Sequence, residues 1–190
     1  MSITRICLAL AVCAALAACT AVSPDRPAQR AAAFDLVGRV AVNYDGRAFS
    51  SGVRWQHQPE RDEIWLLTPV GQALAHIEAD DSGATLTGPD RKQLSAGDVE
   101  SLTRRGLGWE LPLTRLAWWV RGEVVPGGVI GEETRDQQGR LVRLMQDGWR
   151  VVLTHQPDGG KRLPQRVELT REGHQIRLIV DSWRGEGDAP

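Results

Sequence analysis

The sequence predicts one mainly β domain of the α+β class, an antiparallel sheet interrupted by a short helical insert. Two observations support this: apolar and polar residues alternate with a period of two in most segments after Phe34, and turn residues, not helical patterns, separate those segments. Because parallel strands need long crossover connections, usually helices, this pattern favours a meandering antiparallel sheet that curls or closes.

The first two segments form the clearest predicted hairpin. Residues 36–42 read Leu-Val-Gly-Arg-Val-Ala-Val, and their even positions make up an apolar face. The apolar face of residues 49–55 contains Phe49, Val53 and Trp55, with Ser51 between them. Asp45-Gly46 separates the two segments, and this dipeptide is a strong signal for a tight hairpin turn.

Eight further segments continue the strand pattern. They are residues 64–67, 73–79, 84–87, 129–134, 141–145, 149–153, 167–170 and 176–180. Each is short and is bounded by residues typical of turns, so we expect each to pair with its neighbour along the chain.

The helical insert lies in the middle of the chain. Residues 95–98 resemble a helix cap before an apolar set at 99, 102 and 107, and Pro112 opens a second helical stretch. In that stretch Leu113, Leu116, Ala117 and Val120 recur at i, i+3, i+4 and i+7 and form one apolar face. Such an insert either lies across the concave side of the sheet as a lid or completes an ordinary core, and periodicity favours neither.

The N-terminus has the pattern of a lipoprotein signal peptide. Arg5 precedes an uncharged apolar run, residues 6–16, which is too short for a permanent transmembrane helix. Leu16-Ala17-Ala18-Cys19 then forms a lipobox, so we expect residues 1–18 to be removed and Cys19 to carry the lipid anchor, an S-diacylglyceryl group and an N-acyl chain. Thr20 follows where an aspartate would signal inner-membrane retention, which favours the outer membrane.

A tether should join the anchor to the folded domain. Residues 19–33 contain Pro, Ala and Arg without a strong apolar period, and 27–33 are a candidate for a short helix packed on the domain. Residues 34–190 should then form the single folded domain. We expect the outer membrane to hold the protein through Cys19, with the domain facing the periplasm as a monomer.

Charge and cysteine content exclude several classes of function. After loss of residues 1–18 the chain keeps 22 basic and 24 acidic side chains, a formal charge of −2, which argues against a nucleic-acid partner. The three cysteines all lie at or before position 19, so the mature domain has no thiol for disulfides, cysteine-based metal sites or nucleophilic catalysis.

Motifs for catalysis and cofactor binding are also missing. The four histidines are scattered without metal-ligand spacing, and no Gly-x-Ser-x-Gly elbow or phosphate-binding loop is present. The adjacent carboxylates Asp80-Asp81 and Glu132-Glu133 would point to opposite faces of a strand. We therefore expect no enzymatic activity, no metal and no cofactor.

Tryptophan is the unusual component, with seven residues against two phenylalanines and one tyrosine. Several tryptophans lie on apolar strand faces beside small residues such as Gly38, Ser51 and Ala75. This mixture favours space for an apolar ligand, and the alternative is that the indoles fill the interior of a curved sheet.

Several motifs, taken in order, resemble the LolB family of outer-membrane lipoproteins over essentially the whole chain. They are the lipobox, Gly38-Arg39, Trp55-Gln56, Leu66 to Gly71, Leu111-Pro112-Leu113, Trp119 to Gly122, Val167 to Thr170 and Asp181-Ser182-Trp183. The resemblance implies a half-open antiparallel β-barrel of about eleven strands, with helices lidding a hydrophobic cavity. It also implies that the protein accepts lipoproteins from the periplasmic carrier LolA by binding their acyl chains, and inserts them into the outer membrane.

The resemblance and strand parity together predict the site residues. The predicted acyl contacts are Val40, Val53, Trp55, Leu67, Ile77, Trp119, Trp149, Leu169 and Leu178. The resemblance implies a protruding membrane-insertion loop at Pro69, Val70 and Gly71, where Val70 occupies the position of an exposed leucine. Two rival functions are an envelope-assembly lipoprotein that binds protein partners and a lipid-acting hydrolase.

Overall fold

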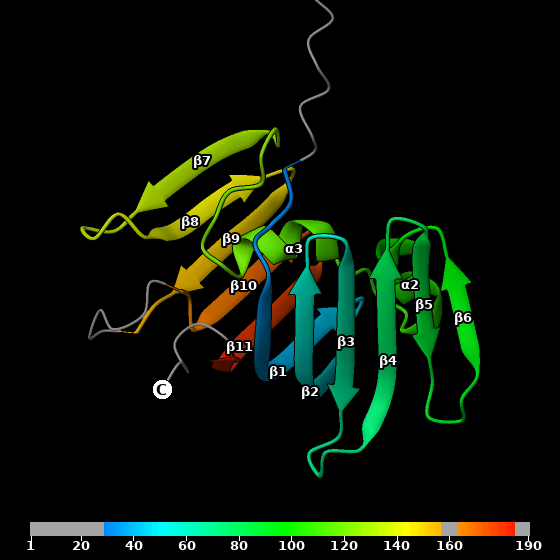
Figure 1. Ribbon diagram of the computed structural model, residues 1–190. Helices are drawn as coiled ribbons and strands as arrows, with labels where there is room; N and C mark the ends of the chain where they lie inside the picture. Colours follow the sequence, from blue (N-terminus) through cyan, green and yellow to red (C-terminus); the bar gives the residue numbers. More distant parts are fainter. Residues whose placement is uncertain (1–28, 157–162, 185–190) are drawn as a thin grey trace, which may run out of the picture.

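An eleven-stranded antiparallel sheet makes up most of the protein (Figure 1). The computed structural model describes residues 29–156 and 163–184. Neighbouring strands follow the order β6-β5-β4-β3-β2-β1-β11-β10-β9-β8-β7, so β1 and β11 join two meanders at the centre. Within the described residues β6 and β7 each pair on one side only, so the curled sheet stays half-open. This confirms the predicted fold class.

The strand bounds agree with the predicted segments within a few residues for ten of the eleven strands. They are β1 (Phe34–Tyr44), β2 (Arg47–Gln58), β3 (Arg61–Leu67), β4 (Ala73–Asp80), β5 (Gly83–Thr87), β6 (Gln93–Ala96), β7 (Ile130–Arg135), β8 (Leu141–Gln146), β9 (Trp149–Thr154), β10 (Arg166–Arg171) and β11 (His174–Arg184).

The predicted first hairpin is correct in both turn and faces. Asp45 and Gly46 have φ of 46° and 74°, the positive values that a tight two-residue hairpin turn requires. The even positions 36 to 42 of β1 are buried and alternate with exposed or half-buried ones. Gly38 is needed at a bulge, because a Cβ there would lie 2.1 Å from the Ile179 carbonyl oxygen of β11.

Two short helices lie within the curve of the sheet (Figure 1). The first, α2 (Val99–Gly106), begins at Asp98, whose carboxylate accepts a 2.7 Å hydrogen bond from the Ser101 backbone N–H. The second, α3 (Leu113–Trp119), follows Pro112 and buries four of its seven residues. Their apolar faces pack with the inner face of the sheet into one core of 31 buried hydrophobic residues.

Two local predictions were wrong. Residues 93–96 form β6, which pairs with β5, whereas we expected residues 95–98 to act as a helix cap; only Asp98 has that role. The described part of the candidate helix at 27–33 has no helical structure; the Arg30 guanidinium donates to the Pro59 carbonyl, and the Ala31 carbonyl lies 3.3 Å from His57 Nε2 of β2.

Candidate functional site

The inner face of the sheet and the helices above it form the candidate site. Eight of the nine predicted acyl contacts lie in this core and are at most 7% exposed: Val40, Val53, Trp55, Ile77, Trp119, Trp149, Leu169 and Leu178. They come from β1, β2, β4, α3, β9, β10 and β11, so folding brings together side chains up to 138 positions apart in the sequence. Apolar side chains of the sheet and the helices fill the space between them.

The ninth predicted contact, Leu67, does not lie on the inner face. It is half-buried and lies outside the core, while Leu66 beside it is 3% exposed. Leu67 pairs with Gly52, and Leu66 pairs with the buried Val53, so Leu67 points to the outer face of the sheet. The two-residue alternation of β3 was started one residue too late, so the prediction chose Leu67 in place of Leu66.

A buried glutamine ties α3 to the sheet, and sequence reasoning missed it. Gln146, at the end of β8, is 1% exposed. Its Oε1 accepts hydrogen bonds from Trp119 Nε1 at 3.0 Å and the Val125 backbone N–H at 3.1 Å, and its Nε2 donates to the Val125 carbonyl at 2.7 Å. We call these three bonds the Gln146 clasp. The same parity that buries Leu144 also places Gln146 on the inner face, and that signal could have identified it.

Two ion-pair groups hold the insert at its edges. Arg115 of α3 pairs with Asp147 at 3.0 Å, and Asp147 also accepts a 2.9 Å bond from the Val129 backbone N–H. That backbone bond, together with the Arg115 guanidinium, lowers the pKa of the Asp147 carboxyl. Near α2, Arg104 and Arg171 both reach Glu110, at 2.7 Å and 3.3 Å, and chiefly the Arg104 bond lowers the Glu110 pKa.

Two tryptophans meet in the middle of the core. The ring centroids of Trp119 and Trp149 are 6.4 Å apart, and the Arg171 guanidinium lies 4.4 Å from the Trp149 ring. Trp119 Nε1 bonds to the clasp, whereas Trp149 Nε1 is buried without a partner among the described residues. These indoles therefore offer a largely apolar surface to any ligand that enters under α3.

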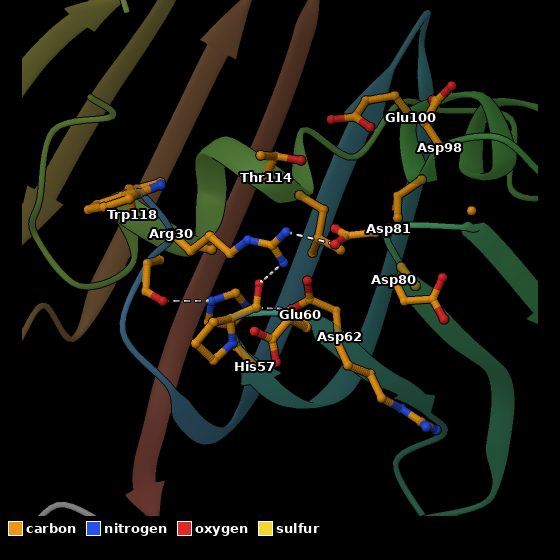
Figure 2. A pocket seen from close by; sticks show the side chains of 18 of the residues that line it. Arg30, His57, Glu60, Asp62, Asp80, Asp81, Asp98, Glu100, Thr114 and Trp118 are labelled. Carbon is orange, nitrogen blue, oxygen red and sulfur yellow. Dashed lines mark hydrogen bonds and ion pairs between the residues drawn. The ribbon is translucent and has the colours of Figure 1, made fainter. Parts of the chain in front are cut away.

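A pocket of about 330 Å³ opens where the helices meet one end of the sheet (Figure 2). Val99, Leu113, Ala117 and Trp118 supply its apolar wall. Six carboxylates also line it: Glu60, Asp62, Asp80 and Asp81 from the sheet side, and Asp98 and Glu100 from the start of α2. Burial raises the pKa of the Glu100 carboxyl, which faces this opening.

The segment that precedes β1 crosses this pocket. Arg30 donates to the Pro59 carbonyl at 2.6 Å and to Asp81 at 2.7 Å. Below it, His57 lies 2.8 Å from an Asp62 oxygen that also accepts a 2.6 Å bond from the Trp55 indole, and its other ring nitrogen lies 3.3 Å from the Ala31 carbonyl. His57 is therefore a satisfied core residue that fixes the point where the chain enters the domain.

The predicted insertion loop is at the opposite end of β3. Thr68 and Gln72 close it, with the Gly71 N–H donating to the Thr68 carbonyl at 2.9 Å. Val70 at its tip is 80% exposed, the most exposed large hydrophobic side chain among the described residues. Pro69 and Gly71 are exposed beside it.

Other sequence predictions fall partly outside the described residues. Cys19, the signal peptide and the tether up to residue 28 lie there. In the described ranges, no group of three His, Cys, Asp or Glu side chains is arranged to hold a metal ion. Within those same ranges, no helix has both the length and the apolar character needed to cross a bilayer.

Comparison with known proteins decides the family. The family model for the outer membrane lipoprotein LolB matches residues 32–183. The chain belongs to the LolB family. An outer-membrane lipoprotein LolB from Nitrosomonas europaea is 41% identical over 162 residues, which cover 82% of this chain and 76% of the relative. Another from Chromobacterium violaceum is 38% identical over 182 residues, covering 94% and 97%.

LolB family membership agrees with the outer-membrane location predicted from the lipobox and Thr20, and it supports a role in lipoprotein localisation. Among solved structures, the chain is similar to a LolA superfamily protein from Nitrosomonas europaea. The match covers 80% of this chain and 85% of that protein. Its TM-score is 0.42 and its identity 8%.

Proposed function

We propose that this chain accepts acylated lipoproteins from a periplasmic carrier of the LolA type and inserts them into the outer membrane. The acyl chains bind between the sheet and helices α2 and α3, and Cys19 holds the domain at the membrane through its own lipid. The observation that carries the proposal is the continuous apolar core between an open sheet and two short helices, in a member of the LolB family.

The energetics make a protein shelter necessary. Each buried methylene contributes about 0.8 kcal/mol, so an acyl chain of roughly fifteen carbons costs about 12 kcal/mol to expose to water. A lipoprotein with three such chains cannot cross an aqueous compartment freely. Side chains such as Trp119, Trp149 and Leu169 replace the lipid environment without any nucleotide or cofactor.

Acyl binding requires the helices to move. Because the inner face is filled by side chains, an acyl chain enters only when α3 or α2 lifts and exposes that face. Helix α3 has seven residues, and the Gln146 clasp and the Arg115–Asp147 pair are its polar ties to the sheet. Short helices with few ties suit a lid that opens for each cargo molecule. The pocket in Figure 2 adjoins the edge from which α3 would open.

Delivery needs contact with the bilayer. Val70 projects from the β3–β4 loop, away from the core, so its apolar side chain can enter the membrane surface while the acyl chains leave. This separates the residue that contacts the membrane from the residues that bind cargo.

Transfer is the experiment that tests the proposal. The domain from residue 20 onward contains every described strand and helix and is mixed with a LolA-type carrier loaded with an acylated lipoprotein. We expect the cargo to move to the domain, and from it to added vesicles. A fluorescent fatty acid that quenches tryptophan emission measures acyl binding alone.

The rival functions predict other results. An envelope-assembly protein that binds only protein partners takes up neither the fatty acid nor the cargo. A hydrolase turns over an ester substrate and loses that turnover when a histidine near the nucleophile is replaced. Either result would replace the receptor proposal.

A further inference from the structure

Three hairpin loops of the sheet share one backbone geometry. In the β3–β4, β5–β6 and β7–β8 loops, the first residue donates its N–H to the carbonyl of the fifth and accepts from the N–H of the fourth, at 2.8–3.0 Å. The loops read Thr-Pro-Val-Gly-Gln (68–72), Gly-Pro-Asp-Arg-Lys (88–92) and Asp-Gln-Gln-Gly-Arg (136–140). Each therefore folds as the same five-residue turn.

The fourth residue of these loops has positive φ in all three. Glycine meets this requirement at Gly71 and Gly139, with φ of 82° and 76°. The β5–β6 loop has Arg91 there, with φ of 64°. A Cβ in this region is unfavourable, so glycine would fit the backbone better. The loop therefore places a long cationic side chain where glycine would remove the strain, and backbone strain of this kind is common at functional sites.

Arg91 lies at the same end of the sheet as the proposed insertion loop. Strands β3, β4, β5 and β6 are successive antiparallel neighbours, so the β3–β4 and β5–β6 loops lie at the same end of the sheet (Figure 1). Arg91 is exposed and makes no ion pair with any described residue. Lys92 next to it has an 88% exposed side chain whose only described ionic partner is Asp90. Two cationic side chains therefore lie at the same end of the sheet as the apolar tip formed by Val70.

We infer that the β5–β6 loop is the electrostatic half of a membrane-docking surface, and that Arg91 binds the phosphate groups of anionic lipids while Val70 enters the apolar layer. This rests on the proposed role of the Val70 loop in delivery. A bilayer fits both features together, since it presents anionic phosphates directly above an apolar interior. A guanidinium suits the phosphate because its fork of N–H donors matches phosphate oxygens.

Vesicle binding tests this inference. The domain from residue 20 onward is titrated with vesicles of phosphatidylcholine alone and with mixed phosphatidylcholine–phosphatidylglycerol vesicles. Loss of one basic residue near an anionic surface lowers binding by about fivefold at low salt, so we expect that loss for Arg91→Gln on the mixed vesicles only. High salt should remove the difference. Arg143→Gln is the matched control, because Arg143 is an exposed arginine on β8, near the opposite edge of the sheet from β5 and β6.

Replacement by glycine separates strain from function. Arg91→Gly relieves the positive φ, so its Tm should equal or exceed that of the parent while binding to mixed vesicles falls as for Arg91→Gln. Equal binding of parent and both Arg91 variants to mixed vesicles, or the same loss in Arg143→Gln, would overturn the inference.

The proposed function fails separately. If the parent domain takes up no fluorescent fatty acid and no cargo yet prefers anionic vesicles through Arg91, the acyl-receptor role is wrong and the docking surface stands. If it takes up both but Arg91→Gln binds mixed vesicles like the parent, the receptor role stands and the docking surface is wrong.

Discussion

The Gln146 clasp gives the sharpest test of lid opening. Gln146→Met keeps a similar side-chain volume but removes all three hydrogen bonds to Trp119 and Val125. With a net contribution of about 1 kcal/mol per bond, the closed position of α3 and the segment that follows it to Val125 loses about 3 kcal/mol. Since 1.4 kcal/mol is a tenfold change, the ratio of open to closed lid rises by about a hundredfold.

This change should act with opposite signs on stability and binding. The apparent affinity of a ligand for an open state scales with the population of that state. Gln146→Met should therefore lower the free energy of unfolding by up to about 3 kcal/mol in urea, yet bind a fluorescent fatty acid up to about a hundredfold more tightly. Gln137→Met, at an exposed position of the β7–β8 loop, is the matched control and should change neither.

A parallel loss of stability and binding would contradict a gating role for α3. If Gln146→Met binds the fatty acid equally or more weakly while its stability falls, the clasp merely supports the core and α3 is not the gate. Hydrogen exchange adds an independent reading, because the amides of α3 should exchange faster in the variant than in the parent.

Four other changes test the anchor, the insertion loop, the face assignment and acid sensitivity. Cys19→Ala should release the domain from membranes, and continued attachment in a fractionation would contradict the anchor. Val70→Glu should leave fatty-acid binding nearly intact but lower membrane partition about 30-fold, from roughly 2 kcal/mol of lost valine burial; equal loss of both activities counts against a dedicated loop. Leu66→Ala should cost about 2–5 kcal/mol in urea unfolding and Leu67→Ala clearly less, and the reverse order would mean that the face assignment is wrong. The pKa of Asp147 lies below its ordinary value of 3.8, so its stabilisation is complete above that pH and is lost as pH falls through the folded value; Asp147→Asn should flatten the acid limb of a Tm–pH curve, and an unchanged limb would refute this.

Local patterns predicted most of the sheet because each hairpin is specified by adjacent residues. Asp45-Gly46 fixes one turn, and the period of two fixes which face of β1 and β2 is buried. The pattern failed at β6, where four residues of mixed polarity form an edge strand. Such a strand is set by pairing with β5 and not by its own sequence, so a local reading could not separate it from the cap that follows.

The site was predicted less completely because its polar parts depend on distant partners. Strand parity places Gln146 on the inner face, but Trp119, which donates to its buried Oε1, lies 27 residues earlier in the chain. His57 is satisfied by Asp62 and by the Ala31 carbonyl, 26 residues away. A sequence read alone treats both as ordinary strand residues, since nothing adjacent to them marks the partner.

The packed interior also constrains how transfer can be driven. An acyl chain gains about 12 kcal/mol on leaving water, but moving from one apolar protein interior to another leaves most of that term unchanged. The direction of transfer then depends on smaller differences, such as the free energy needed to open each lid. In the proposed mechanism the Gln146 clasp and the Arg115–Asp147 pair contribute a few kcal/mol to that term, in addition to the cost of exposing the buried apolar face of α3. A receptor closed by weak ties can therefore accept cargo without an energy source, provided that its lid opens more readily than that of the carrier.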